Sequence, residues 1–322
     1  MIKKTILALF GLLVFNLIYG QDQEKYSLLV AEAEKFYENN EYLKSGQKYS
    51  EAFVAFNVKA GTTDRYNAAC SWALAKEIDS SFVQLFLISQ IGNFTNFRHI
   101  TTDTDLLILY ADTRWNEVLN LVKENKEKAE ANFDKPLIAL LDTIYQEDQG
   151  IRIKVSNVEE KYGRDSDEMK AHWKTIGEKD SINLVQIKKI LDEKGWLGAD
   201  IIGKQGNNTL FLVIQHSDLE TQLKYLPMMR EAVGKGNAQS NKLALLEDRV
   251  SLRQGERQIY GSQIGRDEDG KYFVLPLIKP ENVNQRRKEV GLHLSIEEYA
   301  KHWNIEWDIE KHKERIAKID DK

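Results

Sequence analysis

Apolar residues in the first part of the chain recur at every third or fourth position, which is the spacing of one face of an α-helix. The pattern runs from Glu24 to about Phe56 and is broken at Asn39-Asn40. Its members are Leu29, Ala33, Phe36, Tyr37, Tyr42, Tyr49, Ala52, Phe53 and Phe56. Asparagine favours turns, so the stretch predicts two antiparallel helices that meet at this break.

The helical pattern repeats farther along the chain with an imperfect period of about 34 residues, which is the length of a tetratricopeptide repeat. The shift places Phe36 on Cys70 and Tyr49 on Val83. Ser45-Gly46 occupies the place where a small alanine usually packs between paired helices. The sequence therefore predicts about two or three helical hairpins in this region.

The run Tyr66-Asn67-Ala68-Ala69-Cys70, with Asp103 and Asp105 after it, resembles the closing unit of tetratricopeptide arrays in exported bacterial proteins. The likeness extends over roughly residues 24 to 122. It implies a fragment of an α-solenoid that offers a groove to a partner protein. The single cysteine, Cys70, is interpreted as a small buried hydrophobe, and a reactive thiol is the alternative.

The N-terminus has the layout of a secretory signal peptide. Lys3-Lys4 is followed by a mostly apolar stretch from Ile6 to Ile18, and Gly20 stands at the predicted cleavage site. The apolar stretch is shorter than the roughly 20 residues that span a bilayer. We therefore expect an exported protein, periplasmic or secreted, with no stable membrane span after cleavage. An uncleaved anchor is the alternative.

Helical spacing resumes after Pro136, and Asp134 stands where its side chain can cap the new helix. A charged, helix-forming stretch from Lys123 to Lys135 precedes it, and we place the domain boundary near residue 132. Further helices are expected over 137–149, 165–179, 181–194, 240–252, 283–290 and 295–303.

One segment of the second half is ambiguous between strand and helix. Leu210 to Ile214 suits a buried strand, but helical spacing continues beyond it and favours a helix that starts near Asn208. On such a helix Gln215, Asp218 and Gln222 share one face.

Strand signals are concentrated around a glycine- and aspartate-rich segment. Glu256 to Ile264 and Lys271 to Ile278 flank the turn-like residues Gly265 to Gly270. The aromatic and β-branched residues on both sides suit strands, so the sequence predicts one β-hairpin over about 256 to 278.

The predicted fold is mainly α-helical. Tetratricopeptide-like hairpins over residues 21–132 follow the signal peptide, then a compact helical domain over 133–303 carries the β-hairpin, and 304–322 form a charged tail. The net charge of −5, with both signs interspersed, argues against a nucleic acid partner, because phosphate binding needs a basic surplus on one face.

Polar residues in the second half are gathered in short clusters beside apolar ones, and burial of such groups is costly unless they find partners. Their convergence would therefore form one partly buried site. The candidate catalytic residues are His216 and Asp248. The candidate ligand-binding residues are Gln215, Asp218, Arg249, Gln258, Tyr260, Gln263, Arg286 and Arg287.

Histidine is the side chain best suited to move protons near neutral pH, and Asp218 or Asp248 is expected to fix the tautomer of His216. Arg249, Arg286 and Arg287 suit a carboxylate or phosphate ligand, because one guanidinium group donates two parallel N–H hydrogen bonds to such an anion. No serine lies in the strained elbow of a hydrolase, and no spacing fits a metal site or a cofactor motif.

Two functions stay open for these clusters. The first is an exported cell-envelope protein that binds an envelope partner protein through its first half and a polar ligand near His216. The second is a hydrolase or related enzyme with His216 as general acid and base. A purely structural network, with Arg286-Arg287 in a structural role, is the further alternative.

The ordered clusters of the second half also resemble a known family. Gly195-Trp196, Gln215-His216, Asp248-Arg249 and the run from Gln258 to Gln263 occur in the order and spacing of the uncharacterised bacterial domain-of-unknown-function family 6624. The resemblance extends over roughly residues 137 to 303 and implies no activity.

Overall fold

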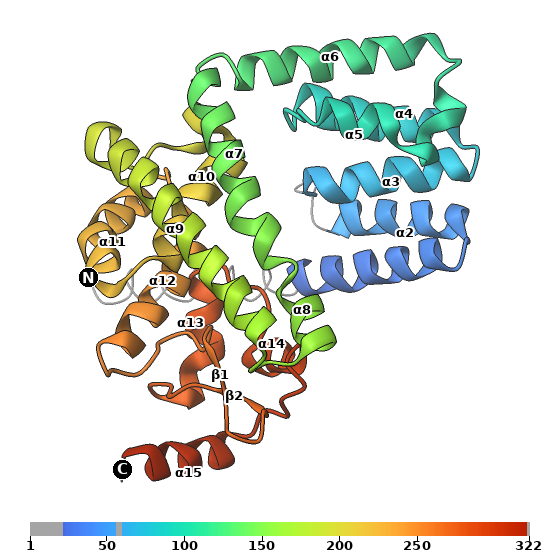
Figure 1. Ribbon diagram of the computed structural model, residues 1–322. Helices are drawn as coiled ribbons and strands as arrows, with labels where there is room; N and C mark the ends of the chain where they lie inside the picture. The colour runs from blue at the N-terminus through green and yellow to red at the C-terminus, as the bar shows by residue number, and fades with distance from the viewer. Residues whose placement is uncertain (1–21, 56–59, 321–322) are drawn as a thin grey trace, which may run out of the picture. The chain divides into compact units, whose positions relative to one another are not determined.

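The computed structural model of the chain describes residues 22–55 and 60–320 and has two compact units (Figure 1). One unit ends at Ala131 and the other begins at Asn132. The predicted signal peptide lies outside the described residues. The fold is mainly α-helical with one small antiparallel sheet among the described residues, which confirms the predicted fold class.

The first unit is a series of helices joined by short turns. After a helix over 22–38 come α2 Tyr42–Ala55, α3 Thr62–Leu74, α4 Ile78–Gln90, α5 Phe97–Thr102, the 3₁₀ helix η1 Thr104–Leu109 and α6 Thr113–Ala129. The predicted break is present, and Asn40 in it has a φ of 60°. Such a backbone conformation is tolerated by asparagine better than by most residues.

Small residues let the first helices approach one another closely. A methyl group built on Gly46 of α2 would lie 2.5 Å from the ring of Trp72 on α3. The neighbouring hydroxyls of Ser45 and Ser71 are hydrogen-bonded at 2.9 Å, and both side chains are buried. The Ser45-Gly46 pair therefore performs the close-packing role that the sequence assigned to this position.

The second unit contains the remaining elements. They are α7 Lys135–Arg152, α8 Val155–Tyr162, α9 Asp167–Lys194, α10 Ala199–His216, α11 Leu219–Gly234, α12 Ser240–Arg253, β1 Ile264–Arg266, β2 Tyr272–Val274, η2 Pro280–Asn282, α13 Val283–Glu289, α14 Ile296–Lys301 and α15 Ile309–Asp320. In the described part of the chain, no helix is both long and apolar enough to cross a bilayer.

The helix ends follow local signals. Asp134 accepts a hydrogen bond from the backbone N–H of Leu137, so it caps α7 as predicted. Ser295 and Glu298 form a reciprocal capping box at the start of α14. Helix α15 occupies part of the segment that the sequence suggested only as a charged tail.

Two helix predictions were wrong in detail. The two helices predicted over 165–179 and 181–194 are the single helix α9, which begins at Asp167. Helix α10 begins at Ala199 rather than near Asn208, with an irregular φ of 68° at Gly203. The predicted common face of Gln215, Asp218 and Gln222 does not exist, because α10 ends at His216. The backbone of Ser217 is extended, and Asp218 caps the following helix.

The predicted β-hairpin is confirmed with shorter strands than expected. Ile264 pairs with Val274 and Arg266 with Tyr272. The turn is narrower than predicted, since Gly265 and Arg266 belong to the first strand. Asp267 closes the turn by accepting a hydrogen bond from the backbone N–H of Lys271 at 2.8 Å.

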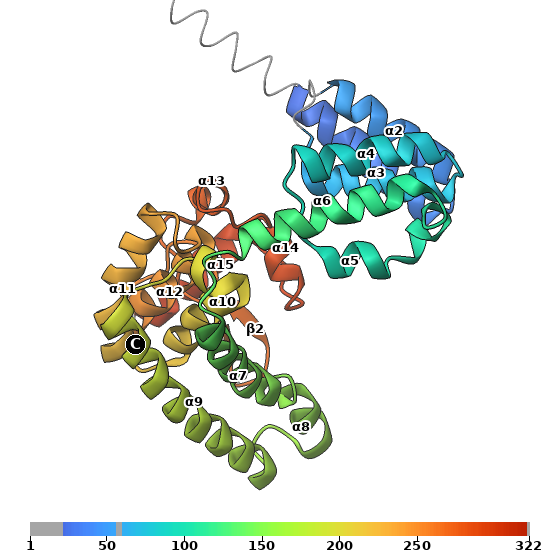
Figure 2. The same cartoon turned by 90° about the horizontal axis from the view of Figure 1, so that it is seen from above.

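The core of the second unit lies among α7, α9, α10, α11 and α12. Helix α9 runs back along α7, and α10 packs against both (Figure 2). The buried side chains include Leu141 and Ile144 of α7, Ile187 of α9, and Leu210 and Ile214 of α10. Each contributes about 1.5–3 kcal/mol on burial. This packing holds the end of α10 against α7.

Candidate functional site

The end of α10 brings His216 against α7. The Nδ1 atom of His216 lies 3.0 Å from a carboxylate oxygen of Asp148. Asp148 is 1% exposed, whereas the side chain of His216 is 19% exposed. The pair therefore has a buried acidic end and an imidazole that reaches the surface.

Arg152 connects Asp148 to a second carboxylate. Its Nη1 donates to Asp148 Oδ1 at 3.0 Å, and its Nη2 donates to both oxygens of Asp180, at 2.9 and 2.7 Å. Burial opposes ionisation of Asp148, but the hydrogen bond and charge of His216, followed by Gln149 and Arg152, outweigh it and lower the pKa of Asp148. The carboxylate is thus held ionised.

The carboxylate fixes the tautomer of His216. An ionised Asp148 only accepts hydrogen bonds, so Nδ1 of His216 carries the proton that it shares with Asp148. In the neutral ring Nε2 then has a free lone pair, and none of the described residues is hydrogen-bonded to it. This nitrogen is available to a ligand or to a proton in transfer.

The carboxylate that is hydrogen-bonded to His216 belongs to Asp148, and it is neither of the two that the sequence suggested. Asp218 accepts the backbone N–H of Thr221 at 2.7 Å and caps α11. Hydrogen bonding to that N–H lowers the pKa of Asp218. The expectation that Asp218 or Asp248 orients His216 was wrong, because the packing of α10 on α7 presents Asp148 instead.

Asp248 holds a loop. Its two carboxylate oxygens accept the backbone N–H groups of Ile259, Tyr260 and Ser262 at 2.6, 2.9 and 2.9 Å. The side chain is fully buried. Burial raises the pKa of Asp248, although the three hydrogen bonds oppose this shift. The geometry assigns Asp248 to the loop over 259–262 rather than to His216.

Arg249, the neighbour of Asp248, joins two of the predicted clusters. Its Nη1 donates to the carbonyl of Gln215 at 2.8 Å and its Nε to the side-chain oxygen of Gln263 at 3.1 Å. Burial, then the charges of Arg253 and Arg152, lower the pKa of Arg249. No carboxylate within residues 22–55 or 60–320 forms an ion pair with it. Arg249 is therefore a half-buried cation without an anionic partner in the described part of the chain.

The other predicted binding residues form an interlocked support around the same loop. Gln258 is fully buried and donates to the carbonyls of Gln263 and Leu275 at 3.1 and 2.8 Å. Tyr260 donates to a carboxylate oxygen of Glu247 at 3.4 Å, and burial is the largest cause that raises the pKa of Tyr260 to about 12.

The double arginine belongs to this support as well. Arg286 donates to the backbone carbonyls of Ile259, Ile278 and Lys279 at 2.8, 2.6 and 3.2 Å. Arg287 is 3% exposed and donates to the carbonyls of Tyr260 and Leu294. The guanidinium groups hold backbone rather than a ligand, which favours the structural alternative for both residues.

The clusters are contiguous in space. The hydrogen bonds of Arg249 join the end of α10 to the loop that Asp248 and Arg287 secure. The buried residues Asp248, Gln258 and Arg287 therefore form one closed hydrogen-bond network. Beside it lies a second, more open group of three residues that are only partly buried, Arg152, His216 and Arg249. The second group is our candidate site.

Comparison with known protein families gives a match over the part of the chain that contains this candidate site. A model of a family of unknown function, DUF6624, matches residues 135–309. The chain belongs to the DUF6624 family. No curated protein and no solved structure matches it. The tetratricopeptide-like region precedes the matched residues and stays a prediction.

The sequence analysis missed three residues of the candidate site, namely Asp148, Arg152 and Asp180. One signal was present. Asp148 continues the buried face of α7 formed by Leu137, Leu141 and Ile144, at intervals of three and four. A carboxylate in an apolar stripe has to find a partner, which makes it a candidate site residue.

Within the described part of the chain, two groups of side chains have metal-ligating atoms close together. In the DUF6624 domain, Asp148, Asp180 and His216 each offer an atom within 4.8 Å of the others. Arg152 already binds both carboxylates, and its charge repels a cation. In the first unit the group is Cys70, Asp103 and Asp105. There Tyr66 donates to Asp103 at 2.8 Å, and burial raises the pKa of Cys70, which disfavours the thiolate that binds metals.

Proposed function

We propose that the protein is exported to the cell envelope and that its DUF6624 domain binds a small, polar, anionic ligand between His216 and Arg249. The observation that carries the proposal is that Arg249 has no anionic partner among the described residues. A half-buried guanidinium retains much of its desolvation cost unless an anion pairs with it. A ligand carboxylate or phosphate would provide that charge.

The geometry leaves donors for such a ligand. A guanidinium has five N–H groups, and the two protein hydrogen bonds of Arg249 use only Nε and Nη1. The Nη2 group of Arg249 therefore remains to donate to the anionic group of the ligand, and Nε2 of His216 remains to accept a hydrogen bond from a ligand hydroxyl. Arg152 and Arg253 add positive charge near Arg249, which favours an anion further.

The second candidate is an enzyme with the same ligand class, and the Asp148–His216 pair supports it. A carboxylate that fixes the imidazole tautomer is the arrangement of a general base. The serine hydroxyls nearby are engaged, since Ser217 donates to the carbonyl of Ile214 and Ser262 accepts from Gln263. Under this candidate His216 activates a water molecule, and the reaction is a hydrolysis.

For the first unit we propose binding of an envelope partner protein. Its support is the predicted tetratricopeptide-like repeat and a cavity of about 390 Å³ beside the turn between α5 and η1. Tyr37, Tyr66 and Asp103 are among its lining residues. Deletion of residues 24–122 should abolish co-purification of the partner, and an unchanged set of co-purifying proteins would contradict this role.

The ligand proposal is tested by titration of the full-length mature protein with inorganic phosphate, acetate and glucose 6-phosphate. At least one should raise the melting temperature in a saturable manner. Arg249→Lys should weaken that effect about tenfold, because lysine cannot reproduce the guanidinium geometry. Arg230→Lys is the matched control, since Arg230 pairs with Glu247 at the surface.

Equal binding by wild type and Arg249→Lys would contradict the proposal. His216→Gln separates the two candidates. A binding protein hydrolyses no glucose 6-phosphate in either form, whereas an enzyme hydrolyses it as the wild type and, as His216→Gln, still binds the ester without hydrolysing it.

A further inference from the structure

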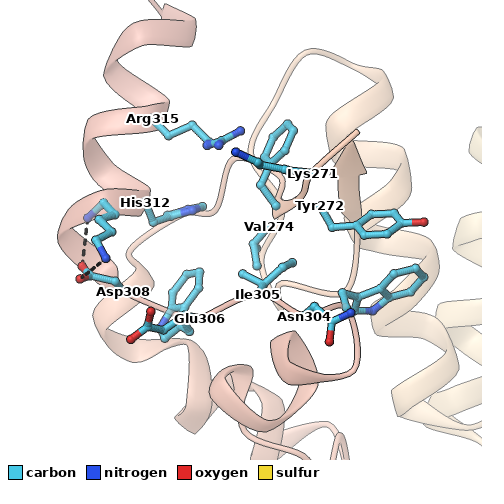
Figure 3. Close-up of a pocket in the computed structure, with 13 residues that line it drawn as sticks. Lys271, Tyr272, Val274, Asn304, Ile305, Glu306, Asp308, His312 and Arg315 are labelled. Atoms are coloured by element: carbon cyan, nitrogen blue, oxygen red, sulfur yellow. Dashed lines mark hydrogen bonds and ion pairs between the residues drawn. The ribbon is translucent and has the colours of Figure 1, made fainter. Parts of the chain in front are cut away.

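A second pocket lies away from His216, where helix α15 covers the β-hairpin. It has a volume of about 410 Å³ and lies between β2, the segment over 303–308 and α15 (Figure 3). Val274 and Ile305 form its apolar part, and Lys271 and Arg315 lie on one side of it. Neither His216 nor Arg249 lines this pocket, so it is independent of the ligand site proposed above.

Two buried nitrogen atoms in the pocket have no hydrogen-bond partner among the residues that the structure describes. They are Nε2 of His312 and Nε1 of Trp307. His312 is 6% exposed, and its ring points toward Val274 across the pocket (Figure 3). The two rings are 4.9 Å apart at their centroids but are not hydrogen-bonded to each other. Unpaired buried donors are rare in native proteins, and a ligand that accepts hydrogen bonds is one explanation.

The surroundings of His312 are positively charged. Burial, followed by the charges of Arg257 and Arg315, lowers the pKa of His312 to about 4. The ring is therefore neutral at pH 7 and has one N–H to donate. Arg315 also packs on the ring of Phe273 at 4.2 Å, which holds the guanidinium in place.

The cations on one side of the pocket are only partly neutralised. Arg315 lies 3.5 Å from a carboxylate oxygen of Asp267. Lys271 points toward Arg315 (Figure 3), and its ammonium group forms no ion pair with any described residue. Of the two acidic residues that line the pocket, Asp308 pairs with Lys311, and Glu306 is exposed and points away from Lys271.

We propose that this pocket binds a carboxylate attached to a compact apolar group. The carboxylate lies against Lys271 and Arg315 and accepts a hydrogen bond from Nε2–H of His312. The apolar group packs on Val274 and Ile305. Such a ligand is either a free organic acid or the C-terminal end of a peptide, since both present the same chemistry.

The test is an NMR titration of the full-length mature protein, observed at the indole N–H of Trp307. The probes are 3-phenylpropionate, its neutral amide, and the tripeptide acetyl-Gly-Ala-Phe as free acid and as C-terminal amide. The free carboxylates should shift the resonance in a saturable way and the amides should not. Stronger binding of the peptide acid identifies a chain end, and stronger binding of phenylpropionate identifies a free acid.

Lys271→Met should weaken binding of the better carboxylate about tenfold, which corresponds to the loss of one charge-assisted contact. Lys301→Met is the matched control, because Lys301 is exposed and does not line the pocket. The melting temperature should be unchanged in both variants. The proposal is overturned if no carboxylate gives a saturable shift up to about 10 mM, if amides and acids act alike, or if Lys271→Met binds as wild type does.

Discussion

His216 and Asp148 are 68 positions apart in the sequence and 3.0 Å apart in space. The contact joins the last residue of α10 to the buried face of α7. It places an ionised carboxylate behind an imidazole whose other nitrogen has no partner among the described residues. A change at Asp148 should therefore alter both the stability of the DUF6624 domain and the protonation of His216 in the candidate site.

Asp148→Asn should destabilise the domain. The substitution removes a buried charge that Arg152 neutralises and to which His216 is hydrogen-bonded, so the free energy of unfolding should fall by about 2 kcal/mol. Urea unfolding measures this change. Asp167→Asn is the control, because the Asp167 side chain is 97% exposed and its effect should remain within about 0.5 kcal/mol.

The same variant tests the tautomer of His216. With Asp148 present, ¹⁵N NMR should detect the proton of the neutral ring on Nδ1. An asparagine can also donate a hydrogen bond, so this preference should weaken in Asp148→Asn. A wild-type ring protonated mainly on Nε2 would contradict the assigned role of Asp148.

Asp248→Asn should be more damaging than Asp218→Asn. An asparagine at 248 leaves only one oxygen for three backbone N–H donors, and we expect a loss of about 3 kcal/mol. Asparagine caps helices as well as aspartate does, so Asp218→Asn should be nearly neutral. Chemical denaturation compares the two. Equal losses would contradict the distinction between the loop anchor and the helix cap.

His312 should make stability depend on pH. Its pKa is lowered from 6.5 to about 4 in the folded chain, first by burial and then by Arg257 and Arg315. Between these pH values the unfolded chain binds a proton here that the folded chain does not, so stability rises with pH across this window. The contribution is present above pH 6.5 and is lost as the pH falls to about 4.

His312→Gln should remove this contribution. The difference in unfolding free energy between pH 4 and pH 6.5 should be smaller in the variant, by on the order of 2 kcal/mol. His302→Gln is the matched control, because His302 is exposed. Parallel pH profiles for wild type and His312→Gln would show that the ring is not buried in its neutral form.

Gly46→Ala and Gly150→Ala should have opposite effects. The added methyl group at 46 meets the Trp72 ring at 2.5 Å, so the helix pair must separate, at a cost of about 1–3 kcal/mol. A methyl group at 150, inside α7, meets nothing within 4 Å. Alanine there should stabilise the helix by up to about 1 kcal/mol. Calorimetric melting temperatures measure both, and a neutral Gly46→Ala would contradict the close α2–α3 contact.

Much of the fold is readable in the sequence because its signals are local. Helical spacing located most of the helices, Asp134 and the Ser295–Glu298 box located two of their starts, and the glycine- and aspartate-rich segment located the hairpin. The errors also had local causes. The extended backbone at Ser217 and the cap formed by Asp218 divide a stretch whose apolar spacing alone reads as continuous.

By itself the sequence determined the helical class, the family membership of the second half and the identity of the polar clusters. Only the tertiary structure decided their partners. It paired His216 with Asp148 and engaged Asp248, Arg286 and Arg287 with backbone groups. It also left Arg249 without an anion among the residues that the structure describes. Periodicity and capping act between residues a few positions apart, whereas the partner of a buried polar group depends on which distant helix packs against it.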